Sequence, residues 1–156
     1  MKMNEWKKTK PEAEAVLSDQ HALDLIAWLR ANKMPPAWLE LENDAVAWTA
    51  EHKGRKLFIV LDDKGMLSLM VQGVLTKKHQ TLIAKRNLQD IVLANLCYCS
   101  RKDGEECSGC GLPPDVAGVD SVLFGREVKH FCCGQMLNFQ NPDGEAIECI
   151  KTLLSL

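Results

Sequence analysis

The sequence predicts an α+β fold in which helices pack against an antiparallel meander sheet and zinc pins a cysteine-rich C-terminal part. Apolar residues alternate with a period of two in the middle of the chain, which is typical of strands. They recur at helical spacing on either side of that region. All seven cysteines lie at or after position 97, so the thiols are confined to the C-terminal part.

Length and composition favour one domain over residues 1–156. The chain has 156 residues, of which 46% are hydrophobic and 26% are charged, as in ordinary globular proteins. A chain of this size buries roughly 70% of its unfolded surface, so we expect a core that is stable without disulfides. We divide the domain into a mobile or loosely docked polar arm (1–14), a helix, meander and helix (15–96), and a cysteine-rich loop, hairpin and terminal helix (97–156).

The first helix is predicted over residues 18–33. Ser18 or Asp19 can accept hydrogen bonds from the free N–H groups at its start. Apolar residues follow at helical spacing, and Pro35 and Pro36 prevent the helix from continuing.

The meander is predicted over residues 46–72. Val46, Trp48 and Ala50 alternate with more polar neighbours, residues 56–61 are apolar on both faces, and residues 67–72 alternate again. Lys53-Gly54 and residues 62–65 supply two tight turns. Three strands joined in this way predict an antiparallel sheet.

Three further elements are expected after residue 77. Asn87 can begin a helix that runs to Leu96. Residues 121–124 and 128–132 flank a glycine turn and predict a hairpin. Asn141 can cap a terminal helix with Pro142 at its first position.

Charge and hydropathy exclude several classes of protein. The net charge of −2 does not suit a dedicated nucleic-acid-binding protein, so that partner is not expected. The longest apolar run covers residues 57–61, whereas a membrane helix needs about 20 such residues. The polar start resembles no secretion signal. We therefore expect a cytoplasmic protein with no membrane contact and with an unknown small-molecule or protein partner.

The strongest motif is Cys107-Ser108-Gly109-Cys110, with CxC before it and Cys132-Cys133 after it. Two residues between cysteines let both sulfurs face one ion, and tetrahedral zinc takes four such ligands. In a reducing compartment, clustered thiols more often bind metal or do redox work than form structural disulfides. We predict one structural zinc bound by Cys99, Cys107, Cys110 and Cys132, with Cys97, Cys133 and His130 as substitutes.

Alternatives to zinc remain open. Cys107 and Cys110 can instead form a redox-active dithiol in an enzyme or thiol-redox protein. An iron–sulfur cluster uses the same thiolates, although the spacings match no common ferredoxin pattern. The thiols can also be free and partly buried. Cys149 lies on the apolar side of the last helix, and we interpret it as a core residue.

The motifs resemble a group of uncharacterised bacterial proteins. The likeness rests on residues 95–99, the Cys107–Cys110 pair, residues 124–127 with Cys132, and the Asn-Pro-Asp sequence at 141–143, and it extends over roughly residues 43–154. Members share a sheet, a cysteine-rich loop, a hairpin and a closing helix that starts at Asn-Pro-Asp. Arg126 stands where lysine is commoner. The resemblance implies a cysteine-ligated metal and no assigned activity.

No catalytic motif stands out beside the cysteines. The four tryptophans at positions 6, 28, 38 and 48 suit a core better than a ligand pocket. The basic residues between 77 and 86 suit a solvated helix face better than a phosphate contact. We therefore expect a small binding or interaction protein with a structural zinc.

Overall fold

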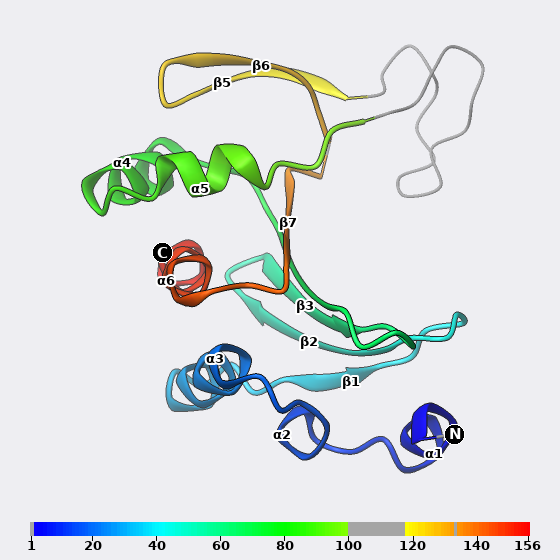
Figure 1. The fold of residues 1–156 in the computed structure, drawn as a ribbon. Helices are drawn as coiled ribbons and strands as arrows, with labels where there is room; N and C mark the ends of the chain where they lie inside the picture. The colour runs from blue at the N-terminus through cyan, green and yellow to red at the C-terminus, as the bar shows by residue number, and fades with distance from the viewer. Residues whose placement is uncertain (1, 100–117, 133) are drawn as a thin grey trace, which may run out of the picture.

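A five-stranded antiparallel sheet forms the centre of the protein, with the strand order β1-β2-β3-β4-β7. Our computed structural model describes residues 2–99, 118–132 and 134–156. In Figure 1, α3 and α6 lie beside the sheet, and a two-stranded hairpin, β5-β6, lies beyond α4 and α5. The strands are β1 (Ala37–Leu39), β2 (Val46–His52), β3 (Arg55–Leu61), β4 (Leu67–Gln72), β5 (Val119–Leu123), β6 (Arg126–Phe131) and β7 (Met136–Gln140). The helices are α1 (Lys2–Thr9), α2 (Ala13–Val16), α3 (Gln20–Ala31), α4 (Lys77–Lys85), α5 (Gln89–Ala94) and α6 (Gly144–Leu154).

The predicted meander is confirmed as β2, β3 and β4. Trp48 pairs with Ile59, and Ile59 pairs with Leu69, so one row of apolar residues crosses all three strands. The β2–β3 turn consists of Lys53 and Gly54, both with positive φ (51° and 81°). A two-residue turn of this kind matches the twist of the strands that it joins.

The two faces of the sheet differ in burial. One face carries fully buried residues that join the helices in a single core, among them Trp48, Ile59, Leu69 and Phe139, each at most 1% exposed. Residues of the opposite face, such as Phe58 and Met70, are half-buried. The core therefore lies between the sheet and its helices, and the α+β fold class with packing helices is confirmed.

The first predicted helix is present as α3. The Asp19 side chain accepts a hydrogen bond from the Ala22 N–H at 2.9 Å, which identifies Asp19 as the cap. Lys33, with φ of 61°, follows the helix, and Met34 donates a hydrogen bond to the carbonyl of Leu29. The expected hairpin is also present, although its turn is the two-residue pair Phe124-Gly125.

Asn87 ends a helix, whereas the sequence predicted that it begins one. Its φ of 58° is left-handed, and its N–H bonds the carbonyl of Ala84 while the N–H of Leu88 bonds that of Ile83. These two backbone hydrogen bonds close the C-terminus of α4. Asparagine tolerates left-handed backbone well, so the same residue suits either end of a helix.

Asn141 likewise does not cap the terminal helix. Its φ is 45°, its N–H donates to the carbonyl of Leu67, and its Oδ1 accepts from the Leu67 N–H. Asn141 therefore ends the β4–β7 pairing. Asp143 is the cap, because its Oδ1 accepts from the Ala146 N–H at 2.9 Å. The helix α6 thus starts two residues later than the predicted first position, Pro142.

The described residues of the polar segment, 2–14, form α1 and the first half of α2. α1 contains no fully buried residue, although Met3 and Trp6 pack against the core. The Trp48 Nε1 donates to the Pro11 carbonyl at 2.9 Å, and Arg30 pairs with Glu12 and Glu14. The segment is therefore held in place by a few contacts spread along its length.

The helices within the described ranges lack the combination of length and apolar composition needed to cross a membrane.

Candidate functional site

The segment Asn95–Cys99 connects the five-stranded sheet to the hairpin. On one side, the Cys97 N–H donates to the Met136 carbonyl at 2.9 Å, and Leu96 forms a bridge with Leu137. On the other side, the Cys132 N–H donates to the Cys97 carbonyl at 2.9 Å. The backbone of Cys97 is therefore bonded to β7 on one side and to Cys132, the residue after β6, on the other.

In this junction, two predicted ligands, Cys132 and Cys99, each lie opposite a predicted substitute. Tyr98 forms an antiparallel bridge with Phe131, so Cys97 lies opposite Cys132 and Cys99 lies opposite His130. The Cys99 N–H donates to the His130 carbonyl at 2.8 Å. Residues two apart on a strand share a face, so a regular ladder would gather Cys97, Cys99 and Cys132 on one side. We call these three residues the cysteine ladder.

The ladder is not fully regular. His130 has a φ of 55°, and β5 and β6 shift register between Val119 and Ser121. The described residues contain no group of three His, Cys, Asp or Glu side chains placed to hold a metal ion. The structure thus sets Cys97 opposite Cys132, and Cys99 opposite His130. His130 is exposed.

The remaining predicted ligands belong to parts of the chain that the structure does not describe. Cys107, Cys110 and the substitute Cys133 lie outside the described residues. The predicted set of Cys99, Cys107, Cys110 and Cys132 therefore remains a prediction. What the structure adds is the pairing of Cys132 with Cys97, which sequence spacing left open.

The environment of the ladder affects its thiols. Cys97, Cys99 and Cys132 are all half-buried. Burial raises the pKa of Cys97, and the neighbouring Cys132 raises that pKa further. A thiol with a raised pKa holds its proton at neutral pH unless a cation compensates the charge of the thiolate.

Gly118 packs directly against the ladder and gives a first prediction. Its φ is 74°, and a Cβ there would lie 3.1 Å from both the Cys99 Cβ and the His130 Cα. We expect Gly118→Ala to lower the free energy of unfolding through this contact as well as through backbone strain. Gly125→Ala is the matched control, since its φ of 75° is similar and its Cβ would meet nothing within 4 Å.

Backbone strain alone costs about 1–2 kcal/mol at either glycine. Denaturation of both variants by urea therefore isolates the contact at Gly118 as the difference between them. Equal losses of stability in the two variants would show that the contact between the new Cβ at position 118 and Cys99 does not lower the free energy of unfolding.

Cys149 is a core residue, as its position on the apolar side of the last helix predicted. It is 0% exposed in α6, and burial raises its pKa to about 12. Trp48 is also fully buried, while Trp6, Trp28 and Trp38 are partly buried and pack against the core. None of the four tryptophans lines the cavities described here.

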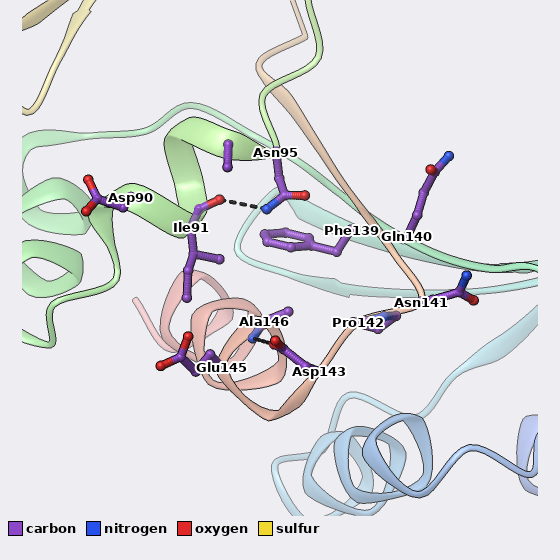
Figure 2. Close-up of a pocket in the computed structure, with 11 residues that line it drawn as sticks. Asp90, Ile91, Asn95, Phe139, Gln140, Asn141, Pro142, Asp143, Glu145 and Ala146 are labelled. Atoms are coloured by element: carbon purple, nitrogen blue, oxygen red, sulfur yellow. Dashed lines mark hydrogen bonds between the residues drawn. The ribbon is translucent and has the colours of Figure 1, made fainter.

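A concave region with a volume of about 340 Å³ lies between α5, the end of β7 and the start of α6 (Figure 2). Asp90 and Glu145 lie on its two sides, and Phe139 and Asn95 form its inner wall. Asp143 also contributes, but its Oδ1 caps α6. All three carboxylates are exposed to water, and the Asn95 amide bonds the Ile91 carbonyl. The region is therefore concave, but none of the described side chains that line it offers a buried polar group without a hydrogen-bond partner, which a specific ligand would need.

Comparison of the chain with models of protein families, with curated proteins and with solved structures finds no match.

Proposed function

We propose that this protein is a small cytoplasmic binding or interaction domain in which a structural zinc ion holds the junction between the central sheet and the β5-β6 hairpin. The observation that carries the proposal is the pairing of Cys97 with Cys132 across the ladder. This pair lies where the backbone joins the two sheets, so an ion bound there would cross-link them.

The junction has few other means of stabilisation. The hairpin contributes Leu123, Val128 and Phe131 to the core, but β5 is otherwise largely exposed. Structural zinc takes four ligands near 2.3 Å and supplies folding free energy where apolar contacts are sparse. Cys97 or Cys99 together with Cys132 would supply two thiolates, and the sequence motif Cys107–Cys110 would supply the other two.

The competing proposal is a thiol-redox protein or enzyme that uses the Cys107–Cys110 dithiol. A redox dithiol requires an accessible thiol of lowered pKa. Cys107 and Cys110 lie outside the described residues, and the raised pKa values of Cys97 and Cys149 concern other thiols. The structural ion is the first hypothesis to test, because the Cys97–Cys132 pairing supports it.

The test measures zinc content and free thiols on the same protein, purified without added metal or chelator. We expect about one zinc per chain and seven free thiols after denaturation. Cys132→Ser should abolish stoichiometric zinc, and Cys97→Ser should reduce it strongly. Both variants should melt at a lower temperature, because binding of the ion contributes to folding.

Cys149→Ala is the control, because it also removes one thiol from the chain. Its side chain is fully buried in α6 and takes no part in the ladder, so this variant should lose stability but keep its zinc. Absence of metal with all seven thiols free would contradict the zinc proposal. Absence of metal with fewer free thiols would support the redox proposal instead.

A further inference from the structure

A groove with a volume of about 370 Å³ lies between the helices α4 and α5 and the turn of the β5-β6 hairpin. In Figure 1, this turn and the two helices lie on the same side of the molecule. Small-molecule sites occupy roughly 300–1,000 Å³, so the volume suits a small organic ligand. We call this region the hairpin groove. Its helical wall consists of Gln80, Thr81, Ala84 and Gln89, and its hairpin wall consists of Phe124 and Arg126.

Gln80 joins the two walls of the groove. Its Nε2 donates to the Leu75 carbonyl at 3.1 Å, and its Oε1 accepts from the Phe124 N–H at 3.0 Å. Phe124, with a φ of 54°, forms the two-residue turn together with Gly125, so this bond ties the turn itself to α4. Both polar atoms of the Gln80 amide are therefore used within the protein, and this side chain builds the groove.

Gln89 presents the opposite case. Its Oε1 is buried and has no hydrogen-bond partner among the described residues. Buried acceptors in proteins are nearly always paired, so this oxygen calls for a donor from outside the chain. The residue as a whole is half-buried and lines the groove. Because the terminal torsion of glutamine is soft, a rotation of the amide lets this oxygen meet an N–H donor bound in the groove.

The hairpin wall supplies a cation. Arg126 is exposed at the start of β6 and takes part in none of the ion pairs among the described residues. No acidic side chain of the described chain lines the groove, since Glu127 projects from the other side of the strand. Lys77 and Lys85 lie one helical turn before and after Thr81, and α4 contains no acidic residue. The groove is therefore positive, although the net charge of the chain is −2.

We propose that the hairpin groove binds a small phosphate ester that carries a flat, N–H-bearing ring, as an adenine mononucleotide does. Glutamine amides pair with the N6 amino group and N7 of adenine, which would give the Gln89 Oε1 its missing donor. Aromatic side chains stack on unpaired bases, and Phe124 lies at the groove as a partly buried ring. The fixed fork of N–H donors on Arg126 matches phosphate oxygens. This proposal does not rest on the zinc site.

The test titrates the full-length protein, as purified, with AMP, adenosine and ribose 5-phosphate, and follows amide chemical shifts. AMP carries both the ring and the phosphate, whereas each of the other two probes lacks one of them. We expect saturable shifts with AMP at Thr81, Gln89 and Gly125, and binding of the other probes weaker by about tenfold or more, because each loses a set of specific contacts.

Three outcomes of this titration would contradict the proposal. Absence of saturable shifts with AMP would overturn it as a whole. Equal affinities for AMP and adenosine would overturn the assignment of a phosphate to the groove. Equal affinities for AMP and ribose 5-phosphate would overturn the assignment of a ring.

Two variants and one control localise the binding. Arg126→Gln should weaken AMP by about tenfold and leave adenosine within about twofold, because it removes only the phosphate contact. Gln89→Leu should weaken AMP and adenosine by the same factor, since both carry the ring. Lys129→Gln is the control for charge, because Lys129 is exposed on the same strand as Arg126 and does not line the groove. Its affinity for AMP should stay within about twofold of the parent protein.

Both variants are expected to fold. Arg126 is exposed, and replacing an unpaired buried acceptor by an apolar group of similar size does not lower the free energy of unfolding. Urea denaturation of Gln89→Leu checks this point, and a clear loss of stability would show that the Oε1 has a partner within the protein. That result would overturn the role of Gln89. An equal loss of AMP affinity in Arg126→Gln and Lys129→Gln would overturn the role of Arg126.

Discussion

Replacing Phe131 by alanine is expected to lower the free energy of unfolding by about 3–5 kcal/mol, as for other fully buried phenylalanines. Phe131 is 0% exposed, and it is the residue through which β6 contributes most directly to the core. It also forms the bridge with Tyr98 that sets Cys97 opposite Cys132. Loss of its ring should therefore loosen the cysteine ladder as well as the core. Zinc content and urea denaturation, measured on the same sample, test both effects.

Tyr98→Ala is the matched control for this prediction. Tyr98 lies opposite Phe131 in the same bridge but is 55% exposed, so its removal should change stability by about 0.5 kcal/mol or less, as for most surface sites. If Phe131→Ala behaved like Tyr98→Ala, the hairpin would not be anchored by its buried ring. If Phe131→Ala lost stability but kept stoichiometric zinc, the ion would bind without help from the ladder geometry.

The elements that the sequence predicted correctly are those whose signal is local. The meander follows from alternation along β2 and β4 and from glycine turns at Gly54 and Gly65. The helix α3 follows from a cap, an apolar stripe and a pair of prolines. In each case the residues that carry the signal also make the contacts, so no distant part of the chain was needed to interpret them.

The errors concern two asparagines: Asn87 closes α4 through local backbone bonds, whereas the role of Asn141 depends on a distant partner. Asn87 and Asn141 both suit a helix start by composition, yet both adopt left-handed backbone. The position of Asn141 is set by Leu67, which is 74 residues away in the chain. A side chain that can cap, turn or end a strand takes the role that its tertiary neighbours impose.

The edges of the sheet were not predicted for the same reason. β1 has three residues, and β7 has five, with Leu137 and Phe139 as its buried positions. β7 pairs with β4 across more than sixty residues of chain. Short strands of this kind are stabilised by the partner rather than by their own pattern. Because the Cys97–Cys132 pairing depends on β7 and β6, sequence spacing indicated a cysteine cluster but left its partners open.

A second large effect is expected at Trp48, where alanine should cost about 3–5 kcal/mol of stability. The ring is 1% exposed and makes an edge-on contact with Trp38, with ring centroids 5.6 Å apart. Its Nε1 donates to the Pro11 carbonyl, so the same side chain also holds the N-terminal segment. Urea denaturation measures the total loss, and amide hydrogen exchange in α1 and α2 measures release of that segment.

Trp48→Phe separates the two roles of this side chain, because phenylalanine keeps an aromatic ring in the core but cannot donate to Pro11. We expect it to lose about 1–3 kcal/mol, and to speed exchange in α2 more than in α3. Uniform acceleration throughout the protein would instead show that the N-terminal segment unfolds only together with the core. In that case the few contacts of this polar, mostly exposed segment would suffice to make it part of the cooperative unit.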